Sequence, residues 1–250
     1  MEAAALGIFM VAAGAVTTVM DSPELPFLAM LPSAAIRRAL VGLAMGGTAM
    51  ALIYSPWGRR SGAHMNPAIT LTFLRLGKIP AWDALFYAIF QVLGGLAGVL
   101  LTAAVIGTDF TRHPVNYVVT VPGQSGILAA GVGEGVISVL MMGAILWASN
   151  RPRIARFTGL LAGILITFFV TFESPYSGFG MNPARTFSSA LPSGIWTAFW
   201  LYLFVPTLGM LLAGEGYALA KGRTAVGCCK LHHRSDRPCI FCGRLLPPGI

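Results

Sequence analysis

The sequence has few charged residues. Lysine, arginine, aspartate and glutamate make up 10% of the 250 residues, against about 25% in an average soluble domain. A water-soluble globular domain is therefore excluded. Hydrophobic residues, in contrast, make up 56% of the chain, and the mean hydropathy is +0.74. We therefore expect the chain to lie in a membrane.

Acidic residues are the scarcest charged type, with 9 in the chain against 17 lysines and arginines. Glu134 and Glu173 are the acids that suggest a catalytic pair. Glu173 is expected in an outer loop, however, and no nucleophile, base and orienting residue form a set. An enzyme is not expected. A secondary transporter is disfavoured for a related reason, because it needs acids or an ion site within its spans, and these spans offer few.

Six apolar stretches are long enough to cross a bilayer, since a spanning helix needs about 20 mostly apolar residues. They are residues 3–20, 39–54, 82–106, 127–149, 155–172 and 196–220. The apolar runs 68–74 and 184–191 are too short to span. Short helices at membrane depth are tolerated only where protein buries them or they line a wet cavity. We therefore predict an all-α membrane protein with six transmembrane helices and two re-entrant half-helices.

One tetrapeptide, Met-Asn-Pro-Ala, occurs twice, at residues 65–68 and 181–184, each time after a glycine-containing loop. Asparagine followed by proline begins a helix, because the asparagine oxygen caps the first free amides and proline has no N–H to leave unpaired. The NH2 groups of Asn66 and Asn182 are then left free to donate. Each helix start carries about half a positive charge. Two facing starts would form an electropositive spot that excludes cations.

The order of these segments indicates an internal duplication. Three spans, with a half-helix after the second, occupy residues 1–110, and the same order returns over residues 125–220. An odd number of spans inverts the second copy in the membrane. Inverted repeats place the functional site at the midplane. We therefore expect Asn66 and Asn182 to face each other within one channel domain, residues 1–220.

Lysine and arginine concentrate on one side of this topology, as the positive-inside rule expects of the cytoplasmic side. Thirteen of the 17 fall there: Arg59, Arg60, Arg75, Lys78, Arg151, Arg153, Arg156, Lys221, Arg223, Lys230, Arg234, Arg237 and Arg244. Both termini are predicted in the cytoplasm, with the protein in a plasma membrane or inner cell membrane. Topology explains the net charge of +8, so no nucleic-acid partner is expected. Because Glu2 directly precedes the first run, without a basic region or cleavage site, we interpret that run as a span rather than a signal peptide.

Residues 61–70 and 180–187, which carry the two motifs, resemble the signature loops of the aquaporin, or major intrinsic protein, family. The pore motifs by this resemblance are Asn66, Pro67, Ala68, Asn182, Pro183 and Ala184. Further matches are Gln91 with Gly94 and Gly95, Glu134, and Pro206 with Gly209. The resemblance covers about residues 1–220. It implies a homotetramer in a lipid membrane, with one pore per subunit and no cofactor for transport, and a buried glutamate that holds loop carbonyls in place.

By the same resemblance, Arg185 is the arginine of the outer constriction, where it repels cations and donates to a passing solute. Val170 takes the position at which water-selective members usually carry histidine. Phe179 matches the aromatic residue of glycerol facilitators. The second span contributes either Met45 or Gly46, depending on an insertion in the following loop. Glycine there predicts a wide pore, and methionine a narrower one.

Other positions favour a water channel. Thr186 and Ala190 stand where glycerol facilitators carry aspartate and a basic residue, and Tyr202 suits a water channel, whereas Leu203 suits a facilitator. We expect a passive channel for water and small neutral solutes that excludes protons and ions. A glycerol- or urea-type facilitator is the alternative, and a membrane junction protein with an occluded pore is a different class. His64 is placed at the cytoplasmic pore mouth, with a structural or pore-lining role rather than pH sensing.

The tail, residues 221–250, departs from the family because it is polar and holds all four cysteines. Cys239 and Cys242 have the two-residue spacing of a zinc knuckle. Cys229 and His232, or His233 in its place, complete four ligands for a structural zinc ion. Disulfides are not expected in the reducing cytoplasm. The alternatives are free thiols on a disordered tail, and palmitoylation of Cys228 and Cys229.

Overall fold

The structure is a computed structural model that describes residues 1–233 and 238–244. Regular structure in these two ranges is helical throughout. The long helices are α1 (Glu2–Asp21), α3 (Ala34–Tyr54), α6 (Ala81–Ile106), α8 (Gly126–Ser149), α9 (Thr158–Phe172) and α12 (Phe199–Lys221). The half-helices are α5 (Pro67–Arg75) and α11 (Pro183–Ser193). Short connecting helices are α2 (Pro26–Met30), α4 (Pro56–Ser61), α7 (Thr108–Thr111), η1 (Asn116–Val118), η2 (Ala155–Phe157), α10 (Ser174–Ser177) and η3 (Arg223–Ala225).

The predicted all-α fold with six membrane-length helices is confirmed. Six helices in the described part are long and apolar enough to cross a bilayer, with η2 and α9 together forming the fifth. The clearest difference in bounds is at α3, which begins at Ala34 rather than residue 39. Arg37 and Arg38 were expected before the helix but lie in it. The helix accommodates Arg37 because its Nε donates to Asp21 at the end of α1, over 2.8 Å.

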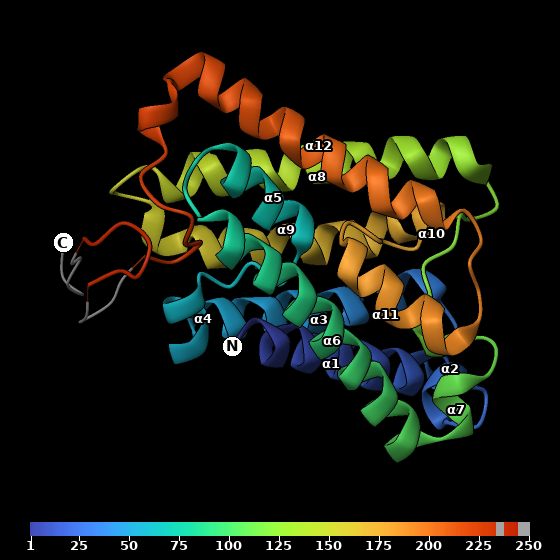
Figure 1. Cartoon of the computed structure of the whole chain (residues 1–250). Helices are drawn as coiled ribbons and strands as arrows, with labels where there is room; N and C mark the ends of the chain where they lie inside the picture. Colours follow the sequence, from blue (N-terminus) through green and yellow to red (C-terminus); the bar gives the residue numbers. More distant parts are fainter. Residues whose placement is uncertain (234–237, 245–250) are drawn as a thin grey trace.

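The two halves pack in equivalent ways, as Figure 1 shows. Helix α1 packs along α6 in the first half, α8 packs along α12 in the second, and α3 packs against α9 across the halves. Each half-helix also packs against the third span of the other half, α5 against α12 and α11 against α6. The half-helices therefore enter the bundle from opposite ends and approach each other inside it.

Glycine permits the tight crossing of α3 and α9. A Cβ built on Gly46 would lie 2.3 Å from the carbonyl oxygen of Gly163, closer than any side chain can approach a backbone. Gly47, one residue along the same helix, has open space beside it. Gly46 therefore belongs to the helix interface.

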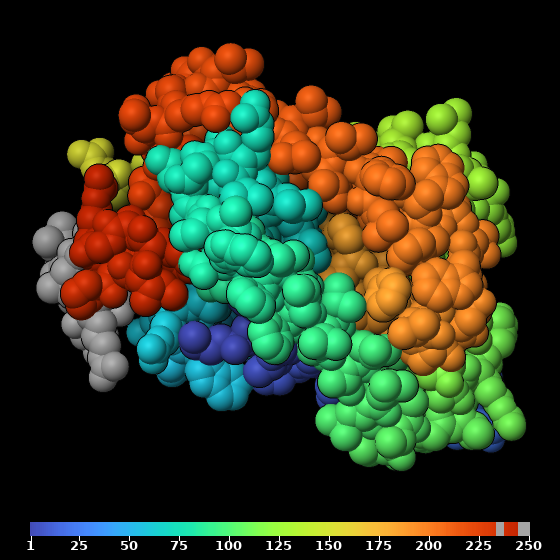
Figure 2. Space-filling view, in the orientation of Figure 1, coloured from blue at the N-terminus to red at the C-terminus, as the bar shows by residue number. Residues whose placement is uncertain are grey.

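The tail folds back over one end of the bundle (Figure 1). Its described residues lie beside α4 and the loop before α5, and Figure 2 shows this segment, in red, seated against the cyan and teal surface of that end. The Leu231 amide donates to the Gly62 carbonyl over 3.2 Å, and Lys230 Nζ donates to the Arg59 carbonyl over 2.9 Å. We call this end of the bundle the tail end. Arg234 and Arg237, which were predicted to lie on the cytoplasmic side, are outside the described residues.

Candidate functional site: a cavity between two capped half-helices

Asn66 and Asn182 cap the two half-helices. Asn66 Oδ1 accepts from the Ala68 amide over 2.8 Å, and Asn182 Oδ1 accepts from the amides of Ala184 and Arg185 over 3.0 and 3.2 Å. Proline follows each asparagine at the first helical position. Each motif therefore begins a helix, as the asparagine cap and the following proline predict.

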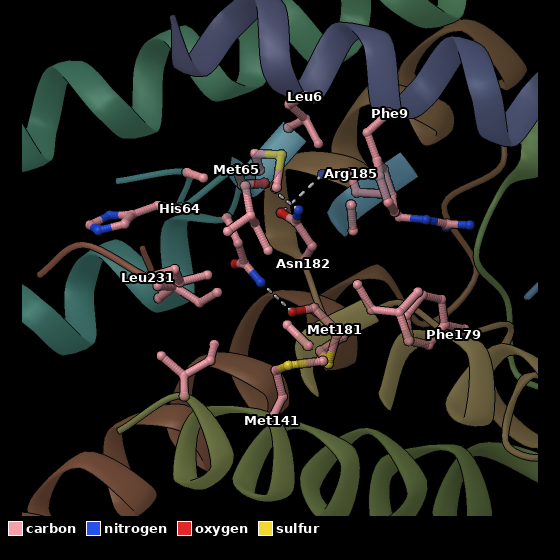
Figure 3. A pocket seen from close by; sticks show the side chains of 18 of the residues that line it. Leu6, Phe9, His64, Met65, Met141, Phe179, Met181, Asn182, Arg185 and Leu231 are labelled. Atoms are coloured by element: carbon pink, nitrogen blue, oxygen red, sulfur yellow. Dashed lines mark hydrogen bonds between the residues drawn. The ribbon is translucent and has the colours of Figure 1, made fainter. Parts of the chain in front are cut away.

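The two asparagines also bind each other's loops. Asn66 Nδ2 donates to the Met181 carbonyl over 2.8 Å, and Asn182 Nδ2 donates to the Met65 carbonyl over 2.6 Å, as the dashed lines in Figure 3 show. The two NH2 groups that the caps leave free to donate thus find partners on the opposite loops, far away in the sequence. A carboxamide nitrogen carries two hydrogens. One hydrogen of each group joins the two halves, which leaves the second for another acceptor.

The loops before the motifs share an unusual backbone. Gly62, Ala63 and Met65 have positive φ in the first loop, and Gly178, Phe179 and Met181 have positive φ at the equivalent positions of the second. Residues other than glycine rarely adopt this conformation, because the Cβ crowds the following carbonyl. The strain is tolerated only where the surroundings hold the loop in place.

Two buried glutamates hold these loops. Glu134 Oε1 accepts from Ser177 Oγ and the Gly180 amide, each over 2.6 Å, and its Oε2 accepts from the Met181 amide over 2.6 Å. Glu2 does the same in the first half. Its Oε1 accepts from Ser61 Oγ over 2.6 Å and the His64 amide over 3.3 Å, and its Oε2 accepts from the Met65 amide over 2.6 Å.

Two tyrosines complete the symmetry of these anchors. Tyr87 donates to the Ser61 carbonyl and Tyr202 donates to the Ser177 carbonyl, each over 2.7 Å. The sequence singled out Glu134 as a holder of carbonyls, whereas its carboxylate binds amides and a hydroxyl, since it can only accept. Glu2 was missed. The available signal was that the first span of each half carries a glutamate, Glu2 in α1 and Glu134 in α8.

A narrow cavity passes between the two asparagines. In Figure 3, Arg185 and Phe179 lie to one side of Asn182, and His64 and Leu231 lie to the other. Most of the remaining lining is apolar: Leu6, Phe9, Ala49, Ile53, Ile69, Met141, Ile145, Ala162 and Ile166. The asparagines therefore provide polar contacts within an otherwise hydrophobic wall.

A second cavity adjoins the first at the end away from the tail. Met45, Val170, Phe179 and Arg185 all line it. Of the two second-span candidates, Met45 lines this cavity and Gly46 is packed against α9. Arg185 Nη1 donates to Thr120 Oγ1, a residue of the loop after η1 that the sequence did not single out.

His64 is 2% exposed and touches the tail. Its Nε2 lies 2.8 Å from the Cys229 carbonyl, and its Nδ1 lies 3.0 Å from Thr70 Oγ1. Because a carbonyl only accepts, Nε2 carries a hydrogen and donates to it. His64 is thus among the residues that line the cavity, and its Nε2 is hydrogen-bonded to the tail.

The tail brings together a different set of metal-binding side chains from the set expected. Cys228, His233, Cys239 and Cys242 place their ligand atoms within 4.8 Å of one another. Cys239, Cys242 and His233, which was the alternative to His232, belonged to the expected set, but Cys228 takes the place that was expected for Cys229. The reason is geometric, since the Cys229 carbonyl and the Leu231 side chain face the channel, while the His232 ring packs edge-on against Tyr54. A hydrogen bond with Cys229, followed by burial, raises the pKa of Cys228 to about 11.

The fold and this cavity define a class. Six membrane-length helices with two half-helices, whose capped starts meet inside the bundle, form a membrane channel of the inverted-repeat type. The sequence profile of the family described as Major intrinsic protein matches residues 2–217. The chain belongs to this family, which consists of channels and not enzymes.

Individual relatives agree with this assignment. Aquaporin NIP1-3 of Oryza sativa subsp. japonica is 32% identical over 177 residues, 70% of this chain and 60% of that protein. Aquaporin TIP4-4 of Zea mays is 33% identical over 174 residues, 65% of each protein. The chain spans about three fifths of the length of the first two curated relatives it matches. The X-ray structure of the aquaglyceroporin from Plasmodium falciparum has a TM-score of 0.69 at 18% identity, covering 86% of this chain and 92% of that one, and shows the fold alone.

Proposed function

We propose that the chain is a passive channel for water and small uncharged solutes that excludes ions and protons. The observation that carries this proposal is the pair of half-helix starts, where Asn66 and Asn182 each have one N–H committed to the opposite loop and one left over. A water whose oxygen accepts from both asparagines cannot also accept from the next water in a file. The proton wire is interrupted at that point.

Charge exclusion follows from the fixed positive potential of the site. Two half-helix starts, each with about half a positive charge, meet beside the asparagines. Arg185 adds a full charge in the adjoining cavity. A cation would lose its hydration in an apolar passage and meet a positive potential at the half-helix starts and Arg185, whereas a neutral solute meets hydrogen-bond donors.

A glycerol- or urea-type facilitator is the second candidate, and one observation favours it. The cavity around Arg185 has apolar side chains from Met45, Val170 and Phe179 and no histidine among its lining residues. Such a wall suits the carbon side of a polyol while the guanidinium binds its hydroxyl groups. Met45 narrows the passage, which favours water.

The surroundings of the channel belong to the same proposal. Residues 1–220 form the channel domain, as the extent of the family match supports. The tail end faces the cytoplasm of a plasma membrane or inner cell membrane, because the basic connections lie at that end. Large apolar side chains exposed on the long helices suit lipid and neighbouring subunits of a homotetramer.

Light scattering of proteoliposomes tests the function. Vesicles that contain the full chain, with and without a chelator, are mixed rapidly with sucrose and then with glycerol. We expect faster shrinkage than in empty vesicles, reduced by Asn182→Ala. Rapid re-swelling in glycerol would identify a facilitator. The proposal fails if no preparation, chelated or not, shrinks faster than empty vesicles.

A further inference from the structure

The tail forms part of the cavity wall at the tail end. Leu231 is 3% exposed and is itself one of the residues that line the passage, next to His64 (Figure 3). Cys229, on the same segment, is fully buried and its carbonyl accepts the hydrogen bond from His64. Segment 229–232 therefore lies at the tail-end mouth of the passage, where a solute would enter or leave, and the Leu231 side chain lines the passage at this point.

The segment's two neighbours both belong to the metal-binding cluster. Cys228 precedes it and His233 follows it, so one bound ion would tie both ends of a short loop. Fixing the ends reduces the entropy that is lost when the loop becomes ordered. Hydrogen bonds of Cys229, Lys230 and Leu231 also hold the segment against the bundle, and the His232 ring packs edge-on against Tyr54.

The cluster has the dimensions of a tetrahedral zinc site. With Zn–S distances of about 2.3 Å, two sulfurs on one zinc lie about 3.8 Å apart. Cys228 Sγ and Cys239 Sγ are 3.6 Å apart. His233 Nε2 lies 2.9 Å from Cys242 Sγ, so small shifts would admit the ion. The Phe241 amide also approaches Cys239 Sγ, at 3.5 Å, an arrangement that stabilises a thiolate.

Charge and ligand type favour the same ion. Lys230, Arg156 and Arg244 line the pocket that contains Cys228, His233 and Cys242, and they balance the excess negative charge of three thiolates around a divalent cation. Three sulfurs and one imidazole nitrogen suit a soft, tetrahedral cation rather than magnesium or calcium.

We propose that Cys228, His233, Cys239 and Cys242 bind one Zn2+ ion, and that this ion holds segment 229–232 across the tail-end mouth of the channel. Zinc then reduces permeation, and its removal releases the mouth. The metal site stands on its own, whereas the closing of the mouth rests on the proposed channel function.

Metal content tests the site. The full-length protein, purified with a phosphine reductant, is dialysed and its zinc measured by mass spectrometry, with a Co2+-loaded sample for absorption spectroscopy. We expect one zinc per chain and a tetrahedral, thiolate-ligated Co2+ spectrum. Cys239→Ser should lose both, and the matched change Cys229→Ser should keep both, because the Cys229 thiol is outside the cluster. Equal metal binding by these two variants, or none by the wild type, overturns the site.

Water permeability tests the closing of the mouth. We expect zinc-loaded wild-type vesicles to shrink several-fold more slowly than chelated ones, and Cys239→Ser vesicles to shrink fast at any zinc level. Leu231→Ala should conduct quickly while it retains zinc. Ile240→Ala, which shortens an exposed tail side chain, should behave as the wild type.

The outcomes separate the two proposals. Wild-type permeability that is the same with and without bound zinc overturns the closing of the mouth and leaves the channel intact. If no preparation conducts even after chelation, the channel function is wrong and the closing fails with it, while metal content still decides the site. A Cys228–Cys239 disulfide that persists in place of zinc after purification with the phosphine reductant would overturn the site.

Discussion

The carboxylate of Glu134 is the acceptor for three donors of a loop that has positive φ at several residues. A carboxylate is the side chain best suited to this task, because it accepts on both oxygens and bonds to a charged acceptor are about twice as strong as neutral ones. Glu2 performs the same task in the other half. The loops are thus held by charge as well as by shape.

Glu134→Gln should destabilise the protein on the order of 3 kcal/mol, because the amide NH2 would face buried donors and leave them unpaired. Glu2→Gln should cost a comparable amount. The midpoint of thermal unfolding in detergent measures both effects. Glu24, an exposed acid, provides the control, since Glu24→Gln should leave the midpoint unchanged. An unchanged midpoint in Glu134→Gln would show that the loop keeps its conformation without the carboxylate.

Arg185 lines both the passage and the outer cavity, and Arg38 lines the outer cavity as well. Arg185→Val should let protons or small cations leak through proteoliposomes, because the positive potential inside the passage would then come from the half-helix starts alone, while water conduction should persist. A pH-sensitive dye inside the vesicles measures the leak under an imposed pH gradient. Arg112→Val, at an exposed loop residue, should leak no more protons or cations than the wild type. If Arg185→Val leaks no protons or cations, ion exclusion does not depend on the charge of Arg185.

Met45 lines the outer cavity from the side of α3, together with Arg38 and Val41. Met45→Ala should raise the ratio of glycerol to water permeability, because it removes the long side chain that faces Val170 and Phe179 across this cavity. The light-scattering assay gives both permeabilities. A ratio that does not move would place the limiting width elsewhere.

The crossing of α3 and α9 depends on the absence of side chains at its closest point. Helix propensity alone favours alanine over glycine by about 1 kcal/mol. At Gly46, however, a methyl group would meet the Gly163 carbonyl at 2.3 Å, and such overpacking costs about 1–3 kcal/mol. The steric clash with Gly163 therefore outweighs the gain in helix propensity when Gly46 is changed to alanine.

Gly46→Ala should lower the unfolding midpoint, and Gly47→Ala should keep or raise it. The two changes are chemically identical and lie on adjacent residues of one helix, but only Gly46 faces α9. The same thermal measurement in detergent distinguishes them. Equal effects would mean that the helices separate easily, and the packing argument would fail.

The helices were largely predictable and the contacts between distant loops were not. The bilayer fixes the length of a span, and Asn-Pro fixes a helix start, so the sequence located all eight elements within a few residues. The partner of Glu2 is a loop about 60 residues away, and nothing local identifies it. Glu2 and Glu134 are 132 residues apart, whereas Asn66 and Asn182 are 116 apart, so the duplication does not align them by simple offset.

The tail shows the same limit. The two-residue spacing of Cys239 and Cys242 identified half of the cluster, because that spacing is itself local geometry. The choice between Cys228 and Cys229, and between His232 and His233, depends on which way the intervening segment turns. That direction is decided by contacts with Gly62, Arg59 and His64.

The exposed apolar faces of the bundle lead to an expectation for the assembly. We expect a molar mass of about four times the 26.4 kDa subunit when the protein is measured by light scattering in a mild detergent. Four subunits allow each apolar face to meet either lipid or a neighbour while each channel stays within its own chain. A monomer that conducts at full rate would show that the tetramer is unnecessary.

The bonds from Asn66 to Met181 and from Asn182 to Met65 are related by the approximate twofold axis of the repeat. Each half gives a donor and receives one, which is the pattern of contacts in a symmetric dimer interface. Two separate half-length chains, inserted in opposite directions, would form the same pair of bonds. The passage thus corresponds to a dimer interface between the two halves of the chain, and neither half forms it alone.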